Sequence, residues 1–307
     1  MRVTQSMLSS NMLYNLNNSY GKMANLQNQL ASGSKINRPS DDPVVAVKGM
    51  GYRRDLGRVE QYTRNMGTVN TWLDTSNESL DQVSSALTRV KELIVQASND
   101  TNTTEDREKI NAEMEQIRKQ LQDIGNTQVA GDYIFSGTKT GAPLFTSDGT
   151  YNGANVNSEE VKIEISSGIQ LNVNTDGADV FKKIDDFMKS ATAVLTSGAG
   201  GAEISEALGA EITNIDDPTG PKIPGLQVLS EKVLEKLADI GARQNRVEVM
   251  ENRLGIQEVN VIKQISDNED VDYAKTITEM VTHQSIHQAG LSVGAKIIQQ
   301  TLVDFIR

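Results

Sequence analysis

Residues 59–97 have the sequence VEQYTRNMGTVNTWLDTSNESLDQVSSALTRVKELIVQA, and this stretch determines the fold class. Apolar residues alternate at intervals of three and four from Val59 to Ala97, and only Ser76 interrupts them with a polar side chain. This spacing predicts one face of an α-helix roughly 60 Å long, at about 1.5 Å per residue. A compact domain does not need so long a helix, so we expect lengthwise packing against other helices. The expected rod-core residues of this helix are Val59, Tyr62, Met66, Val69, Leu73, Leu80, Val83, Leu87, Val90 and Ile94.

Four further segments have a helical pattern of apolar residues. They cover roughly residues 5–31, 104–124, 233–261 and 276–307. In the third of these, apolar residues recur every seven positions, and the expected core residues are Ile240, Val247, Leu254 and Val261. Its second seam position is polar (Gln244, Glu251 and Glu258), so this side of the helix is either partly buried or faces a polar partner. The heptad spacing predicts antiparallel or coiled-coil packing of these helices into a rod.

The segment between the first two helices is a predicted turn, because it combines Pro39, Ser40, Asp41, Asp42 and Pro43. Asp42 as N-cap and Pro43 at the first helical position predict a separate short helix that ends near Met50.

The centre of the chain differs in composition, because residues 136–178 are rich in Gly, Thr, Asn and Ser. Alternating apolar residues at 161–165 and 169–173 flank Ser166-Ser167-Gly168 and predict a β-hairpin. Residues 179–196 and 203–213 are possible helices. We therefore expect a mainly α protein: an elongated coiled-coil or helical-bundle rod built from both chain ends, with a small inserted α+β domain. The expected parts are residues 1–57 (N-terminal assembly helix and turn), 58–135 (first half of the rod), 136–222 (inserted domain), 223–269 (second half of the rod) and 270–307 (C-terminal assembly helix).

Both chain ends are almost uncharged, although the whole chain of 307 residues has a net charge of −11. Residues 3–34 carry only Lys22, whereas residues 59–125 carry 19 charged side chains. A helix with an apolar stripe and few charges is poorly suited to stand alone in water, so the ends are expected to be covered by each other or by further copies. The predicted subunit-interface residues are Met12, Leu16, Met23, Leu26, Leu30, Met280, His287, Leu291, Ile298, Leu302 and Phe305.

Composition argues against several partners and compartments. The acidic charge argues against nucleic acid, and the longest clearly apolar run, residues 44–47, is far too short to span a membrane. No cysteine is present, which excludes disulfides and thiolate metal sites. Arg2 is followed by no apolar h-region, so we expect no cleaved signal peptide.

Chemical sites are scarce in the sequence. His283 and His287 are spaced i, i+4 with Glu279 one turn earlier, which makes them weak metal-ligand candidates. A packing or interface role is the better interpretation, because His287 lies on the apolar seam and no further ligand is evident. Asp41-Asp42 is better explained as a capped turn than as an acid–base pair. We find no catalytic constellation and expect neither an enzyme nor a cofactor.

Several motifs resemble the flagellin superfamily. Residues 29–43, QLASGSKINRPSDDP, closely resemble its N-terminal signature, and residues 89–97, RVKELIVQA, are similar to its core helix. Residues 272–274 (DYA) and 302–306 (LVDFI) match its C-terminal end. The motif residues are Ser32, Gly33, Ile36, Asn37, Pro39, Asp41, Asp42 and Pro43. The resemblance covers about residues 1–145 and 225–307.

Within the superfamily, two details resemble the members that join the flagellar hook to the filament. These are Pro39 and Pro43, which flank the two aspartates, and residues 131–145, which begin GDYIFSGTKT. The resemblance implies a structural adaptor in a ring of identical copies, located outside the cell at the hook–filament junction. It implies export without a cleaved signal peptide, and as partners the other hook-associated junction protein, flagellin and a cytoplasmic export chaperone. A filament flagellin is the alternative, and a metal-dependent enzyme using Glu279, His283 and His287 is an alternative of another class.

The resemblance also raises a secondary hypothesis. In flagellins, the surface equivalent to residues 89–97 is recognised by an innate immune receptor, so Arg89 and Leu93 are candidates for weak recognition, with Glu113 on the next helix. A solvated helix face is the competing interpretation.

Overall fold

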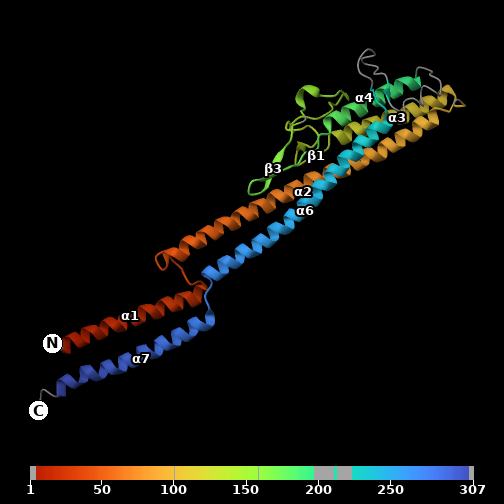
Figure 1. The fold of residues 1–307 in the computed structure, drawn as a ribbon. Helices are drawn as coiled ribbons and strands as arrows, with labels where there is room; N and C mark the ends of the chain where they lie inside the picture. The colour runs from red at the N-terminus through yellow and green to blue at the C-terminus, as the bar shows by residue number, and fades with distance from the viewer. Residues whose placement is uncertain (1–4, 100, 158, 197–210, 213–222, 304–307) are drawn as a thin grey trace. The chain divides into compact units, whose positions relative to one another are not determined.

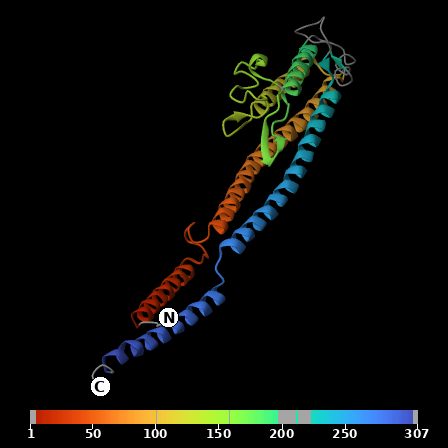
Figure 2. The same ribbon diagram turned by 60° about the vertical axis from the view of Figure 1, so that its left-hand side comes forward.

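The computed structural model describes residues 5–99, 101–157, 159–196, 211–212 and 223–303 (Figures 1 and 2). Long α-helices dominate the described residues, which confirms the mainly α fold class. The helices are α1 (Gln5–Ser32), α2 (Pro43–Ala97), α3 (Thr104–Gly125), α4 (Ala178–Thr196), α6 (Leu226–Glu269) and α7 (Tyr273–Val303), with a short 3-10 turn η1 (Gly153–Asn155). The strands form antiparallel pairs: β1 (Gln128–Val129) with β2 (Asp132–Tyr133), β3 (Lys162–Ser166) with β4 (Ile169–Asn172), and β5 (Glu211–Ile212) with β6 (Ile223–Pro224).

The chain divides into two compact units. One unit combines residues 1–59 with residues 256–307, so it is built from both ends of the chain. The other unit contains residues 60–255. The five-part domain division expected from the sequence, including an inserted domain at 136–222, stays a prediction.

The helix α2 is continuous where the sequence suggested two helices. The expected short helix ending near Met50 and the long helix from Val59 are parts of the same 55-residue element. The segment between them, residues 51–58, contains only two residues that weaken a helix, the isolated Gly51 and Gly57. A single glycine costs a helix about 1 kcal/mol. Proline would be needed to stop the helix firmly, and none follows Pro43 within α2.

The apolar seams of α2 and α6 are buried. Every residue of the expected rod core is at most 7% exposed except Tyr62, which is half-buried. Ser76 is fully buried between the apolar positions of α2, and its Oγ has no hydrogen-bond partner in the described structure. Gln244, at a polar seam position of α6, donates a hydrogen bond to Asp74 of α2 at 2.8 Å, so the partner at this position is polar.

The hairpin of β3 and β4 lies where the alternating pattern predicted it, with Gly168 in the turn at φ +73°. Two helices hold its backbone. Asn65 of α2 donates a hydrogen bond to the carbonyl of Glu164 at 2.7 Å, and Arg243 of α6 donates to the carbonyls of Asn172 and Asn174 at 3.3 and 3.0 Å.

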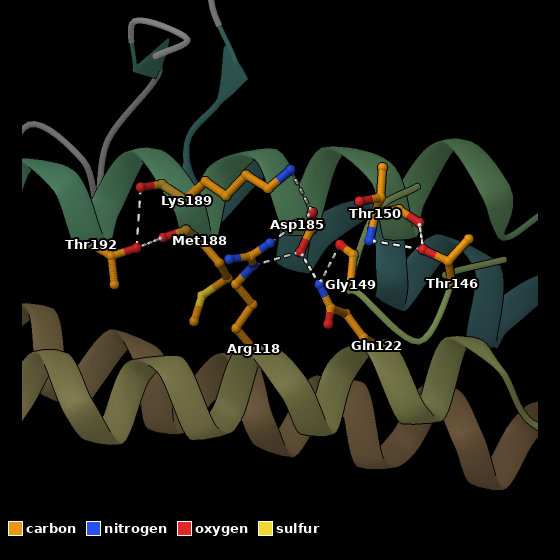
Figure 3. Close-up of polar contacts among 9 residues, drawn as sticks. All are labelled: Arg118, Gln122, Thr146, Gly149, Thr150, Asp185, Met188, Lys189 and Thr192. Carbon is orange, nitrogen blue, oxygen red and sulfur yellow. Dashed lines mark hydrogen bonds and ion pairs between the residues drawn. The ribbon is translucent and has the colours of Figure 1, made fainter. Parts of the chain in front are cut away.

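The predicted helix at 179–196 is present as α4, which packs on α3. A buried carboxylate lies at this contact (Figure 3). Asp185 has only 3% of its side chain exposed, and it accepts hydrogen bonds at 2.7 Å from both Arg118 Nε and Gln122 Nε2. Lys189 Nζ lies 3.2 Å from the same carboxylate, so two cations offset the cost of burying its charge. Because the two cations and Gln122 surround one carboxylate, this cluster fixes α4 on α3.

The second predicted helix of the centre, at 203–213, is not supported where it can be seen. Residues 211–212 form strand β5, while residues 203–210 and 213 lie outside the described residues.

Candidate functional site

The helices α1 and α7 pair along their length, although almost the whole chain separates them in sequence (Figure 1). Their least exposed positions recur at intervals of three and four on each helix, as expected for two helices in lengthwise contact. On α1 these positions are Ser9, Met12, Leu16, Ser19, Met23, Leu26 and Leu30, with Gln29 beside the last of them, and on α7 they are Thr276, Met280, His283, His287, Gly290 and Gly294.

Glycines of α7 make room for apolar side chains of α1. A Cβ on Gly294 would lie 1.7 Å from Met12 Cε, and a Cβ on Gly290 would lie 3.8 Å from Leu16 Cδ1. The sequence analysis missed both glycines, because a residue without a side chain adds nothing to an apolar pattern. Their spacing of i, i+4 on a predicted amphipathic helix was the signal that could have identified them.

The weak metal candidates do not form a metal site in the described structure. Glu279 is exposed, while His283 and His287 are half-buried against α1. No group of three or more His, Cys, Asp and Glu residues able to hold a metal ion occurs among the described residues. His287 instead packs at 6.2 Å from the ring of Tyr20, and its Nδ1 is buried without a hydrogen-bond partner.

A groove of about 500 Å³ runs between α1 and α7. Leu8, Met12 and Leu16 line it from α1, and Ile286 and Val293 line it from α7. Leu8, Ile286 and Val293 are exposed by 46%, 55% and 55%, so the groove is a largely apolar surface open to a further partner.

The family-motif turn pairs with the segment between α6 and α7, and we call the contact of residues 33–53 with 267–273 the clasp. Its backbone bonds join Val271 N to the Gly33 carbonyl at 2.9 Å and Lys35 N to the Glu269 carbonyl at 2.7 Å. Gly33 has φ +74°, a conformation that favours glycine, which explains why this residue follows the end of α1.

Glu269 anchors the clasp through its side chain, which is 10% exposed and forms an ion pair with Arg53. A Cβ on Gly49 would lie 2.0 Å from Glu269 Oε1, so α2 and α6 approach closely here because position 49 has no side chain. Asn268 Nδ2 adds a hydrogen bond at 3.0 Å to the Val45 carbonyl.

The two motif aspartates are structural. Asp42 Oδ1 accepts hydrogen bonds from Val44 N at 3.0 Å and Val45 N at 3.1 Å, which is the N-cap of α2 that the sequence predicted. Asp41 Oδ2 accepts from Arg38 N at 2.9 Å and Asn37 N at 3.2 Å, which closes the turn. The remaining motif residues place this turn: Ser32 ends α1, Ile36 is half-buried, Pro39 is exposed, and Pro43 begins α2.

Exposed apolar side chains concentrate in the unit built from the chain ends. Of 20 large apolar side chains exposed in the described structure, only Val95, Leu234 and Val249 belong to the unit of residues 60–255. The other 17 lie in residues 1–59 and 256–307, on α1, α7 and the adjoining ends of α2 and α6. Exposing so much apolar surface to water is unfavourable, so the end unit resembles a protein–protein interface that nothing in the described part of the single chain covers.

The predicted interface residues differ in their placement. Met12, Leu16, Met23, Leu26, Leu30, Met280 and His287 are half-buried in the α1–α7 pair, whereas Leu291 is 49% exposed. The side chains of Ile298 and Leu302 and the whole of Phe305 lie outside the described residues. Their role between subunits stays a prediction.

Of the two candidate residues for recognition by an innate immune receptor, only Arg89 lies on the surface. Leu93 is only 1% exposed, so a binding partner cannot contact it on the folded surface. Arg89 is exposed and forms ion pairs with Glu92 and Glu113, and these hydrogen bonds raise the pKa of the guanidinium above its ordinary value.

None of the described helices combines the length and apolar character that crossing a membrane requires.

Comparison with known proteins identifies the family. The bacterial flagellin N-terminal helical region matches residues 3–140, and the bacterial flagellin C-terminal helical region matches residues 227–306. Flagellar hook-associated protein 3 of Escherichia coli K12 is 27% identical, over 94% of both chains. A flagellin of Halalkalibacterium halodurans is 26% identical over 94% of this chain and 92% of its own.

The fold has relatives among solved structures. A Vibrio parahaemolyticus structure described as a flagellar hook-associated protein covers 75% of this chain and 100% of its own, with a TM-score of 0.61 and 23% identity. At that identity the likeness concerns the fold. Together, the two helical regions, the motif turn within the first of them and the full-length relatives lead to one conclusion: the chain belongs to the flagellin family and is a relative of flagellar hook-associated protein 3.

Proposed function

We propose that the protein is a structural adaptor of the bacterial flagellum, in which copies form a ring layer that joins the hook to the filament. The terminal helices α1 and α7 carry the assembly. The observation that supports this most directly is that 17 of the 20 large apolar side chains exposed among the described residues lie in the unit built from the chain ends. The full-length likeness to flagellar hook-associated protein 3 favours the junction over other positions in the flagellum.

Burial of these side chains between copies provides the driving force for assembly. Removing apolar surface from water contributes about 25 cal/mol per Å². The nearly uncharged helices have a second advantage, since α1 carries only Lys22 as a charged residue. Many copies can stand close together in a ring because little like-charge repulsion accumulates between them.

The proposed partners are further copies within the ring, the other hook-associated junction protein, flagellin, and a dedicated export chaperone in the cytoplasm. The proposed location is outside the cell, at the hook–filament junction, after export without a cleaved signal peptide. A catalytic role is not part of the proposal, because the family is structural and the sequence offers no catalytic constellation.

Deletion of the gene tests the adaptor function. We expect cells that are not motile, carry hooks without filaments and release flagellin monomer into the medium, with all three defects reversed by a plasmid copy. Electron microscopy of the cells and immunoblotting of the medium measure these outcomes. Intact filaments on the deletion strain would contradict the adaptor function.

A filament flagellin is the competing function, and the observation in its favour is the flagellin relative of 26% identity. Purified full-length protein separates the two. An adaptor forms no long fibres when it is incubated with filament seeds, whereas a filament protein elongates those seeds to micrometre length. Seed elongation by this protein alone would favour the flagellin function.

A further inference from the structure

The first turns of α2 expose an apolar surface with basic charge. Val44, Val47 and Met50 are exposed by 64%, 69% and 68%. Residues 43–58 contain four basic residues against the single acidic Asp55. Arg53 and Arg58 pair with Glu269 and Asp55, while Lys48 and Arg54 form no ion pair within the described residues and are exposed. We call Val44, Val47, Lys48, Met50 and Arg54 the basic patch.

The first turns of α6 expose an apolar surface with acidic charge. Glu231, Leu234, Glu235 and Ala238 are all exposed, and their spacing of three, four and seven places them on one face of the helix. Leu234 is 56% exposed and is one of three large apolar side chains exposed among the described residues of 60–255. We call these four residues the acidic patch.

The carboxylates of the acidic patch have lysines nearby but no ion-pair partner in the described structure. Neither Glu231 nor Glu235 forms an ion pair in the described structure, and Glu231 only accepts a hydrogen bond from Gln227 at 3.3 Å. Lys232 lies about 60° round the helix from Glu235 and about 100° from Glu231, whereas Lys236 lies about 100° or more from both, and both lysines are half-buried. The exposed face therefore presents negative charge beside apolar surface.

We propose that the basic patch of one copy docks on the acidic patch of a second copy. The two surfaces are complementary in apolar surface and in charge. Each has apolar side chains at its centre, and their unpaired charges have opposite signs. The occupant is a second copy because both complementary surfaces belong to this chain. The inference rests on the proposed function, since it specifies how copies of the adaptor meet.

The contact has a direct consequence for assembly geometry. The two patches are different surfaces, so each copy can give one and accept one. Such a heterologous contact continues from copy to copy and closes into a ring when the rotation per copy allows it. A contact between identical surfaces would stop at a dimer.

Cysteine cross-linking tests the contact, because the chain contains no cysteine of its own. The variant Val47→Cys with Leu234→Cys is expressed as the full-length protein in cells, and isolated flagella are treated with a short bismaleimide. We expect covalent dimers and higher oligomers on a denaturing gel. Each single variant is expected to give none, because one patch alone provides only half of the contact.

The matched control is Val47→Cys with Gln82→Cys, since Gln82 is an exposed position on α2 outside both patches. Absence of oligomers from the patch variant in flagella that carry filaments would overturn the docking contact and leave the adaptor function standing. Dimers from Val47→Cys alone, or equal oligomers from the control, would also overturn it. Loss of filaments in the gene deletion is a separate readout, so failure of either idea can be recognised.

Charge reversal provides a second test on the cross-linkable background. Lys48→Glu with Arg54→Glu should lower the oligomer yield roughly threefold to tenfold, because two exposed ion pairs each contribute little. Adding Glu231→Lys with Glu235→Lys should restore the yield, which also shows that the chain has folded. A yield unchanged by the first pair, or not restored by the second, would contradict the proposed pairing.

Discussion

Gly294 of α7 leaves the space in which the Met12 side chain of α1 ends. A Cβ at position 294 would lie 1.7 Å from Met12 Cε and 2.8 Å from Met12 Sδ, so the two residues are matched in size. The α1–α7 pair thus depends on a residue that has no side chain.

This relationship predicts a difference between two identical substitutions on α7. Gly290→Ala should be tolerated, because its Cβ meets Leu16 at an ordinary 3.8 Å and alanine favours a helix by about 1 kcal/mol over glycine. Gly294→Ala brings the same helical gain but must displace Met12, at a cost of about 0.5–1.5 kcal/mol for a strained rotamer. Cross-linking of α1 to α7 in assembled flagella, through cysteines placed on the two helices, measures the pairing. Equal pairing in both variants would contradict the size match, and Met12→Ala should rescue Gly294→Ala.

Ser76 predicts a stabilising substitution. Its hydroxyl is buried in the α2 seam without a hydrogen-bond partner in the described structure, and such a group costs about 1–3 kcal/mol to desolvate. Ser76→Ala should raise the free energy of unfolding by about 1 kcal/mol, as measured by urea denaturation of the full-length protein. Ser85→Ala is the control, because Ser85 is exposed on the same helix. A lower urea midpoint for Ser76→Ala would show that the hydroxyl contributes to the fold.

Asp185 predicts a large loss of stability. Asp185→Ala would leave Arg118, Lys189 and Gln122 without their shared acceptor, and breaking a buried pair from one side costs about 3 kcal/mol. The pair of Asp179 with Lys183 lies on the same helix and is far more exposed, with 53% and 34% of the two side chains accessible, so Asp179→Ala is the matched control and should cost about 0.5 kcal/mol. Urea denaturation compares the two, and similar losses would contradict the structural role of the Asp185 cluster.

The N-terminus of α3 predicts a dependence on pH. Thr103 Oγ1 donates a hydrogen bond to Asp106 at 2.6 Å, and this bond, with a contribution from Lys109, lowers the pKa of Asp106 below its ordinary value. A carboxylate with a lowered folded pKa stabilises the fold above its unfolded pKa of about 4, and this stabilisation is lost as the pH falls through the folded value.

Asp106→Asn should therefore lower the urea midpoint at pH 7, and this deficit relative to the parent protein should shrink as the pH falls below about 4. Glu115→Gln, an exposed substitution in the middle of α3, should change neither midpoint appreciably. A deficit of Asp106→Asn that persists unchanged in acid would show that the pKa shift is not the cause.

The sequence predicted those parts of the fold in which side-chain periodicity carries the information. The spacing of three and four along the α2 seam continues over residues 59–97, with Ser76 as its one polar member, and the expected core residues other than Tyr62 are buried. The hairpin at 162–172 followed from strict alternation around Gly168, and the cap of α2 followed from Asp42 and Pro43. In each of these elements, local residues determine local structure.

Contacts between distant residues were harder to predict. The glycines Gly49, Gly290 and Gly294 act through the space they leave for Glu269, Leu16 and Met12, and a pattern of apolar residues contains no trace of that space. The hydrogen bond between Val271 and Gly33 is equally hidden, because it joins backbone groups more than 200 residues apart. The prediction that a short helix ends near Met50 was wrong, because isolated glycines weaken a helix without ending it.

The hairpin of β3 and β4 has a mechanical consequence. Asn65 holds it to α2 and Arg243 holds it to α6, so one small element is fastened to both long helices of the unit of residues 60–255. Sliding α2 along α6 would have to break these hydrogen bonds together with the bond from Gln244 to Asp74. The hairpin therefore acts as a cross-brace against shear, the kind of load that a rotating shaft imposes on each of its joints.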